Sequence, residues 1–369
     1  MRIFLLVVAA CLLVGGAWLV VSRTPATSAT SAAQPPGADR AIDVIALGSC
    51  ARQDKPLPVW DVIAAHEPDV FLFLGDNMYA DLERSRRAIT PTDVAGAYVE
   101  LAGHETFDRF RRAVPILATW DDHDYGLNDA GKELPFKAAS ERLMLQFFRE
   151  PIDSPRWDRP GVYGSWQFGP EGRRVRVILL DTRTFREGLE RNPQGRSGGG
   201  GPYVPTEDDS RTLLGEAQWQ WLESELRKPA DVRLIGSSIQ VVAREHGWET
   251  WGNFPHERAR LYELIRETRA DGVVFVSGDR HLMEISRDDT DATPYPMWDF
   301  TASGLNERTR DVREPNRFRV GPVHRTTNFG VVQIDWDADP VTITLDGRDG
   351  DNRVLTKRTV ELKALRVKR

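Results

Sequence analysis

The sequence lacks a second cysteine that could pair with Cys50 in a disulfide within its soluble part. Its two cysteines are Cys11 and Cys50, and Cys11 lies inside an apolar N-terminal segment. Cys50 is therefore a lone thiol. Two interpretations stay open at this point. A free cysteine usually packs as a small buried hydrophobe, but its thiolate can also be a metal ligand.

The sequence also lacks any segment dominated by lysine and arginine. It has 49 Lys and Arg residues against 55 Asp and Glu residues, which gives a formal net charge of -6. Such a balance does not supply the basic surface that binds the phosphate backbone of nucleic acids. We therefore expect no nucleic-acid partner. Nothing in the sequence indicates an obligate protein partner, and there is no internal repeat.

The N-terminus differs from the rest of the chain. Residues 3–21 are apolar without a break, and residues 22–40 are rich in Ser, Thr, Ala and Pro. The apolar run approaches the ~20 residues that span a bilayer and exceeds the ~7–15 apolar residues usual in a cleaved signal. We predict a membrane anchor or signal segment at residues 1–21, a flexible linker at 22–40 and one domain at 41–369.

This N-terminus predicts an exported protein. We expect it to be anchored in a membrane and to face the periplasm or the cell exterior, or to be secreted if the segment is cleaved as a signal peptide. Lipidation at Cys11 ranks third, because the apolar run continues past that residue.

Short apolar runs alternate with helical patterns along the rest of the chain, which indicates an α/β fold with largely parallel central strands. Helices are expected at residues 59–66, 136–148, 215–227 and 256–268. Residues 189–202 are typical of a mobile loop. Strands are expected at residues 42–47, 70–74, 114–119, 175–180, 233–236 and 272–276, followed by antiparallel strands at 329–336, 341–345 and 359–362.

Polar residues that could bind metal or phosphate follow five of these strands. Cys50, Asp76, Asp122 and Asp279 are among them. In open α/β sheets, ligands bind outside the carboxyl ends of the strands. The run Asp121-Asp122-His123-Asp124 places three carboxylates in four residues, and their repulsion must be relieved by a cation or by solvent. The pattern therefore favours a metal site, with a solvated turn as the alternative.

The motifs that carry these residues resemble the PhoD-like (alkaline phosphatase D) family of calcineurin-like metallophosphoesterases. The resemblance implies a four-layer sandwich of two mixed β-sheets flanked by helices. It also implies a hydrolase that acts on phosphate mono- or diesters. The matching motifs are Gly48-Ser49-Cys50, Gly75-Asp76-Asn77-Met78-Tyr79, Trp120-Asp121-Asp122-His123-Asp124, Leu180-Asp181-Thr182-Arg183 and Gly278-Asp279-Arg280-His281.

The resemblance further implies a centre that contains Fe3+ and Ca2+, with other divalent metals as alternatives. Thiolate, phenolate and imidazole suit a transition metal, and carboxylates with an amide oxygen suit calcium. The implied ligands are Cys50, Tyr79 and His281 for iron, Asp122, Asp279 and Asn128 for calcium, and Asp76 as the bridge between the two ions.

In the expected reaction, a metal-bound hydroxide attacks phosphorus. His123 is then the candidate general acid. Arg183, and less strongly Arg52, are candidates for binding the phosphate, because a guanidinium matches phosphate oxygens bidentately. A surface ion pair is an equal alternative for Arg183. Two other functions stay open: a phospholipase-type or cell-envelope phosphodiesterase, and a tethered binding protein without activity on the same scaffold.

Overall fold

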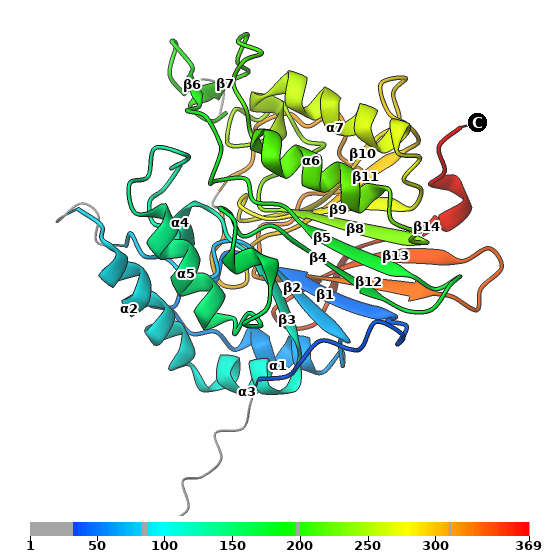
Figure 1. Cartoon of the computed structure of the whole chain (residues 1–369), viewed down its shortest axis with the longest axis horizontal. Coiled ribbons are helices and arrows are strands. Elements are labelled where there is room, and N and C mark those ends of the chain that lie inside the picture. The colour runs from blue at the N-terminus through cyan, green and yellow to red at the C-terminus, as the bar shows by residue number, and fades with distance from the viewer. Residues whose placement is uncertain (1–31, 83–87, 197–199, 310, 369) are drawn as a thin grey trace, which may run out of the picture. The chain divides into compact units, whose positions relative to one another are not determined.

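The computed structural model describes residues 32–82, 88–196, 200–309 and 311–368 (Figure 1). The expected anchor at residues 1–21 and most of the linker at 22–40 lie outside these ranges, so both stay predictions. Within the described ranges, no helix is long and apolar enough to cross a bilayer. Residues 32–40 form neither helix nor strand, but they contact the domain. The Ala33 amide donates to the Arg111 carbonyl at 3.1 Å, and Arg40 pairs with Asp69 at 2.8 Å.

One mixed sheet has six strands in the order β14-β13-β12-β1-β2-β3. Strands β1, β2 and β3 are parallel to one another, whereas β12, β13 and β14 join as antiparallel neighbours. The strands are β1 (Val44–Gly48), β2 (Val70–Leu74), β3 (Ile116–Thr119), β12 (Asn328–Asp335), β13 (Thr342–Asp349) and β14 (Val354–Glu361).

The second mixed sheet also has six strands, in the order β10-β11-β9-β8-β5-β4. Strands β5, β8, β9 and β11 run parallel, and β4 and β10 are antiparallel edge strands. The strands are β4 (Gly164–Phe168), β5 (Val175–Leu179), β8 (Val232–Ser237), β9 (Val273–Ser277), β10 (Met283–Asp288) and β11 (Met297–Ala302).

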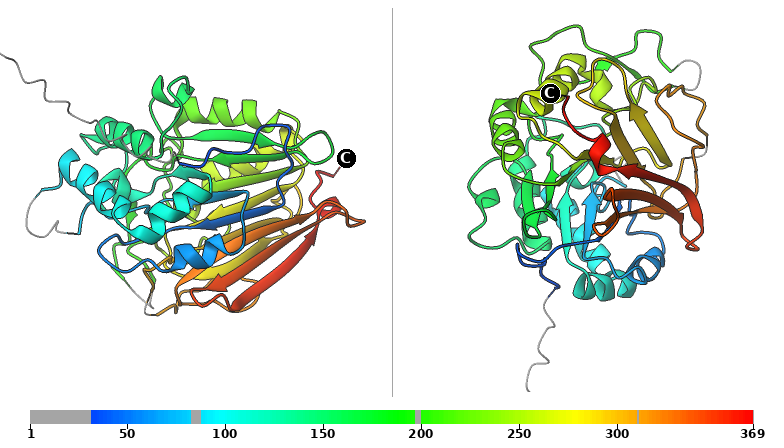
Figure 2. Two further views of the ribbon diagram at one scale, coloured as in Figure 1. Left: turned by 90° about the horizontal axis from the view of Figure 1, so that it is seen from below. Right: turned by 90° about the vertical axis from the view of Figure 1, so that its right-hand side faces the viewer.

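Helices cover the outer face of each sheet, so the two sheets pack against each other between helical layers (Figures 1 and 2). The helices beside the first sheet are α1 (Val59–Ala64), α2 (Pro91–Ala102), α3 (Glu105–Ala113) and α5 (Lys137–Phe147). Those beside the second sheet are α6 (Gly215–Leu226) and α7 (Pro255–Glu267). The expected four-layer α/β sandwich is confirmed.

Strand β2 shows why these layers form. All five of its residues are fully buried, and successive side chains point to opposite faces of a strand. Phe71 and Phe73 therefore pack on the helical side, where they contact the Trp60 ring with centroids 5.2 and 5.6 Å apart. Leu72 and Leu74 belong to the other hydrophobic cluster, which lies between the sheets. A strand apolar on both faces fits a sheet covered on both sides.

Most of the expected elements are present, with ends shifted by a few residues. The sequence prediction missed α2, α3, β4, β10 and β11. Helix α3 is short and buries only Phe107 and Phe110. Strand β10 alternates apolar residues with Glu284, Ser286 and Asp288, which are buried because they bind other polar groups. Because polar residues fill most positions of β10, its sequence does not contain the apolar run that predicts a buried strand.

The expected loop at residues 189–202 is in part regular structure. A two-stranded sheet joins β6 (Glu190–Arg191) to β7 (Tyr203–Val204) at its ends. Residues 197–199 lie outside the described ranges, so the expectation of mobility stays untested.

Candidate metal centre

The carboxyl ends of strands from both sheets meet at one edge of the sandwich. Glycines allow the loops there to approach each other closely. A Cβ on Gly75, whose φ is +92°, would lie 2.5 Å from the Asp121 Cβ. A Cβ on Gly278 would lie 2.6 Å from the Ser49 hydroxyl and 2.8 Å from the Leu74 carbonyl. The loops after β1, β2, β3 and β9 are therefore in contact.

Side chains in these loops are held by strained backbone. Nine described residues other than glycine have a positive φ, and five of them lie in this region. Positive φ is uncommon outside glycine and costs energy, so its concentration in one place points to a functional site. The five are Cys50 (62°), Asp76 (48°), Asp129 (59°), Asp279 (65°) and His281 (54°).

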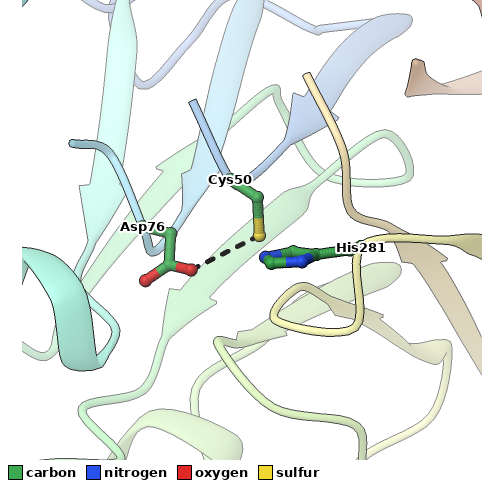
Figure 3. A group of neighbouring side chains, drawn as sticks. All are labelled: Cys50, Asp76 and His281. Atoms are coloured by element: carbon green, nitrogen blue, oxygen red, sulfur yellow. Dashed lines mark hydrogen bonds between the residues drawn. The ribbon is translucent and has the colours of Figure 1, made fainter. Parts of the chain in front are cut away.

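Four predicted ligands form the first group. Figure 3 shows Cys50, Asp76 and His281 pointing toward one another, with the thiol 3.5 Å from Asp76 Oδ2. One ligand atom of each of these three residues lies within 4.8 Å of the others. The Tyr79 hydroxyl donates to Asp76 Oδ2 at 3.0 Å and lies 3.1 Å from His281 Nε2. Thiol, carboxylate, phenol and imidazole thus converge on one point.

Burial strongly disfavours charge on this group when no cation is near. It raises the pKa of the Cys50 thiol well above its usual value, and the negative charge of Asp76 raises it further. Burial likewise raises the pKa of Asp76 and that of Tyr79. It lowers the pKa of His281 to about 4, so this imidazole is neutral. A bound cation reverses the balance for the anionic groups, because it favours their deprotonated forms.

A second group extends from the other side of Asp76. Ligand atoms of Asp76, Asp122 and His123 lie within 4.8 Å of one another. The Asp122 side chain accepts the Asp129 amide on Oδ2 at 2.6 Å, whereas its Oδ1 is buried without a hydrogen-bond partner. An unpartnered buried carboxylate oxygen is costly. Asp122 Oδ1 therefore fits a cation, and Asp76, which belongs to both groups, fits the expected bridging position.

His123 is held by a carboxylate that the sequence prediction missed. Its Nδ1 lies 2.5 Å from Asp81 Oδ1, and its Nε2 is on the side of Asp122, 3.9 Å from Oδ1. The Tyr79 ring packs beside it at a centroid distance of 4.1 Å. Burial lowers the pKa of His123, but the charges of Asp122, Asp76 and Asp81 outweigh burial and raise it well above its usual value.

A third group consists of Asp122, Asp129 and Glu249, whose carboxylate oxygens lie within 4.8 Å of one another. At that distance each pair repels by about 3 kcal/mol in a medium of effective dielectric constant ~20. Burial raises the pKa of Asp129 to about 7, and Glu249 and Asp122 contribute. The sequence gave no signal for Glu249, which is far from every motif. Asp129 is next to the predicted Asn128.

The remaining predicted ligands lie at the same cleft. Asn128 and Asp279 both line it. The backbone amide of Asn128 donates to the Asp81 carboxylate at 3.0 Å. Burial raises the pKa of Asp279, with a further contribution from Asp121. Asp279 does not belong to a group of three convergent His, Cys, Asp or Glu ligand atoms within the described ranges. Their role as ligands stays a prediction. The cleft has a volume of about 200 Å³.

The structure does not place Arg183 where it could bind a substrate. Its side chain is fully buried below the cleft, where it donates to Asp121 through Nε at 2.7 Å and to Glu249 through Nη1 at 2.7 Å. Ser238 also donates to Asp121, at 2.6 Å. The expected phosphate contact is therefore corrected to a buried ion-pair network. Its partners, Asp121 and Glu249, lie next to or within the ligand groups.

Arg52 is partly exposed, and its guanidinium is already paired. It donates to Asp54 through Nε at 2.9 Å and through Nη2 at 2.6 Å, and its Nη1 lies 3.6 Å from Glu307. Both donors of its fork are thus taken by one carboxylate. Arg52 is not among the residues that line the cleft, so the geometry does not support a phosphate contact here.

Comparisons with known proteins show to which family this chain belongs. The family model of the PhoD-like phosphatases matches residues 45–343. Alkaline phosphatase D of Bacillus subtilis (strain 168) is 23% identical over 278 residues, which are 67% of this chain and 47% of that protein. The chain thus spans about half the length of this curated relative.

Three solved structures with the same fold come from proteins with different descriptions. A structure of PhoD matches with a TM-score of 0.70 at 18% identity, covering 90% of this chain and 72% of that one. Purple acid phosphatase PPD1 from yellow lupin seeds matches at 0.58 and 12%, covering 89% and 55%. GAP50, described as the anchor in the inner membrane complex of Plasmodium, matches at 0.54 and 13%, covering 89% and 90%. At these identities the matches show the fold alone.

The buried position of Arg183 generates a stability prediction. Arg183→Met should lower the free energy of unfolding by about 3–5 kcal/mol, because it leaves the Asp121 carboxylate buried without an arginine and leaves Glu249 paired with Arg186 alone. Urea denaturation of the metal-free protein measures this. Arg260→Ala is the matched control, since its pair with Glu216 is exposed and worth at most ~1 kcal/mol. An Arg183→Met protein as stable as the parent would contradict the buried network.

The Cys50 environment generates a second prediction. Cys50→Ser should reduce the iron content of the purified protein while changing the stability of the metal-free form by only about 1 kcal/mol. The serine hydroxyl can replace the thiol in its contacts with Ser303 Oγ (3.0 Å) and Ser49 Oγ (3.3 Å), but it does not become an anionic ligand as readily. Elemental analysis and urea denaturation after chelation measure the two effects. Unchanged iron content would show that Cys50 is only a packing residue.

Proposed function

Since the chain belongs to the PhoD-like phosphatase family, we propose that it is a metal-dependent phosphoesterase that hydrolyses phosphate mono- or diesters. One observation carries the proposal. Two groups of ligand atoms, one with thiol and imidazole and one with carboxylates, share Asp76 at the same edge of the sandwich. Such a shared carboxylate is what a site for two ions requires.

Cys50, Tyr79 and His281 would hold a transition metal, which we propose to be Fe3+, because thiolate, phenolate and imidazole together suit such a metal. Asp122, joined by Asp129 or Asn128, would hold a harder ion such as Ca2+, which prefers oxygen. Asp76 would contact both. When bound, the two ions supply an activated water and neutralise charge on the phosphate. Every ligand needed for this is present in the described residues.

His123 is suited to donate a proton to the leaving group. The Asp81 carboxylate at Nδ1 requires a proton on that nitrogen. When the ring is protonated, Nε2 can donate to an oxygen in the cleft, which His123 lines. Asp81 and the Tyr79 ring hold the imidazole in place, so little ordering is needed during the reaction.

The two alternatives from the sequence differ in what supports them. GAP50, which has the same fold, is described as an anchor, so the fold also occurs in a protein with that role. However, a scaffold that has lost activity is expected to lack ligands, and here every residue predicted as a ligand lines the cleft or lies in the group around Asp76. A lipid substrate would need an apolar cleft. Trp248 lines the cleft, but the nearby Trp251 and Phe254 are core residues and do not line it.

Removal of the bridging carboxylate tests the proposed function. Asp76→Asn should reduce hydrolysis of p-nitrophenyl phosphate and bis(p-nitrophenyl) phosphate by at least about 10³-fold, because one change weakens both ion sites. Incubation with a chelator should abolish the activity of the parent protein, and adding back iron and calcium should restore it. Circular dichroism controls for folding. A fully active Asp76→Asn protein would contradict the proposal, and zinc alone in elemental analysis would contradict the assigned metals.

The role of His123 can be tested separately from metal binding. His123→Asn should lower kcat by about 10²–10⁴-fold for an alkyl phosphate, whose leaving group needs a proton, and much less for p-nitrophenyl phosphate, whose leaving group is stable as an anion. Asp81→Asn should produce a smaller loss of the same kind. An equal loss on both substrates would show that His123 acts as a metal ligand or a structural residue instead.

A further inference from the structure

The walls of the cleft are mostly negative. A phosphate ester must enter a site lined by Asp76, Asp122, Asp129, Glu249, Asp279, Asp311 and Glu314. Among the described residues that line the cleft, Arg280 is the one arginine, and there is no lysine. With Arg183 buried below the cleft and Arg52 paired elsewhere, Arg280 is the guanidinium available at the place where the phosphate binds.

The backbone fixes the position of Arg280 at the centre. It lies between Asp279 and His281, both of which have a positive φ. The Arg280 amide donates to the Gly278 carbonyl at 2.8 Å. Burial raises the pKa of Asp279 and lowers the pKa of His281. The positive charge of Arg280 makes a smaller contribution that lowers the pKa of both side chains. Arg280 is therefore part of the same electrostatic environment as the candidate ligands.

Two contacts hold the guanidinium of Arg280 in one orientation. Its Nη2 donates to Glu314 Oε1 at 2.6 Å, and both side chains are almost fully buried, at 10% and 5% exposure. Its Cζ lies over the Trp248 ring, 5.3 Å from the centroid. A cation over an indole face is stabilised by the ring electrons. A group held in this way loses little entropy when it binds a ligand.

Trp248 is itself held in place by a buried histidine. Its amide donates to His246 Nδ1 at 3.1 Å, and His246 is buried. Burial lowers the pKa of His246 well below its usual value, and the nearby charges of Arg280 and Arg319 lower it further. A neutral imidazole can accept this hydrogen bond. A second cation, Arg196, has its Cζ 4.5 Å from the Trp248 centroid.

We propose that Arg280 binds a non-bridging oxygen of the substrate phosphate, and that Glu314 and Trp248 position its guanidinium for this contact. The proposal rests on the phosphoesterase function above and names the residue that recognises the phosphate. Guanidinium and phosphate form short, charge-assisted hydrogen bonds, which the low dielectric of a buried cleft strengthens. Arg280 thus takes the role that the sequence pattern suggested for Arg183.

A different role for the same contacts must be distinguished. Glu314 belongs to the segment that joins β11 to β12, and this segment also contacts the site through the Thr309 amide, which donates to the His281 carbonyl at 2.9 Å. The Arg280–Glu314 pair could serve only to fasten this segment. In that case the pair itself would matter, and loss of either partner would have the same effect. If Arg280 binds phosphate, loss of its guanidinium should matter more than loss of the negative charge on Glu314.

Isothermal titration calorimetry of the metal-loaded full chain with inorganic phosphate separates these roles. Arg280→Ala should weaken phosphate binding by about tenfold to a hundredfold, as expected for a lost hydrogen bond to a charged group. Arg280→Lys should recover part of the loss. Glu314→Gln should bind phosphate at least as tightly as the parent, because the glutamine side-chain oxygen can still accept from Nη2 and hold the guanidinium in place, while the competing negative charge is removed. In steady-state kinetics, Arg280→Ala should raise KM more than it lowers kcat.

Arg319→Ala is the matched control. Arg319 also forms an ion pair with a buried carboxylate, Glu284, and lies near His246, but it does not line the cleft. It should leave phosphate affinity unchanged. Parent-like affinity in Arg280→Ala, or an equal loss in Glu314→Gln, would overturn the proposed contact. Arg280-dependent phosphate binding by a parent protein that hydrolyses no ester would instead refute the phosphoesterase function and leave the contact standing.

Discussion

The structure depends on burying several acidic groups together at the point where the two sheets meet. Asp76, Asp122, Asp279 and the Cys50 thiol all lie where water cannot solvate their charged forms. Burial is the largest factor that raises the pKa of Cys50, Asp76 and Asp279. A folded protein accepts this cost only when another interaction offsets it. For Asp122 the positive charges of His123 and Arg183 outweigh burial and lower its pKa. For the other groups, a multivalent cation can neutralise several of them at once. The strained backbone at four of the candidate ligands has the same explanation.

The loops that carry the candidate ligands must also be held in place before any metal ion binds. A buried network of ion pairs and hydrogen bonds below the cleft does this. Arg183 compensates Asp121 and Glu249 on one side. On the other, Asp124 accepts the amides of Asp121 at 2.7 Å and Asn77 at 3.3 Å, which links the loops after β2 and β3. Buried ion pairs often contribute little net stability compared with apolar packing, but removal of one partner is costly. The network is therefore better suited to fixing one arrangement of loops than to stabilising the fold.

The sequence predicted those parts of the site that lie directly after recognisable strands. Cys50, Asp76, Asp122 and Asp279 each follow an apolar run, and parallel strands bring such positions together. Asp81, Asp129 and Glu249 were missed because their place depends on how loops fold back, as when Asp81 accepts the Asn128 amide. The four-layer architecture came from the family resemblance, since periodicity alone gave only α/β. The buried polar residues of β10 likewise look like a loop until their partners are known.

The error over Arg183 and the omission of Arg280 have one physical origin. Both arginines follow central strands of the second sheet, so a sequence pattern treats them alike. What separates them is the direction that the local backbone gives to the side chain. The Asp121–Asp124 run shows the same effect. Helix α4 (Asp122–Tyr125) begins there, with Asp121 and Asp124 bonded reciprocally as a capping box.

Residues three apart share a face of a helix, so Asp121 and Asp124 both point into the buried network. Asp122 and His123, which lie between them, point into the cleft. Arg280 lines the cleft itself, whereas Arg183 turns inward and pairs with Asp121 and Glu249. Acidic loops from the two sheets pack against each other at this edge, and each arginine compensates a part of their charge. Arg183 does so below the cleft, and Arg280 does so in the cleft wall.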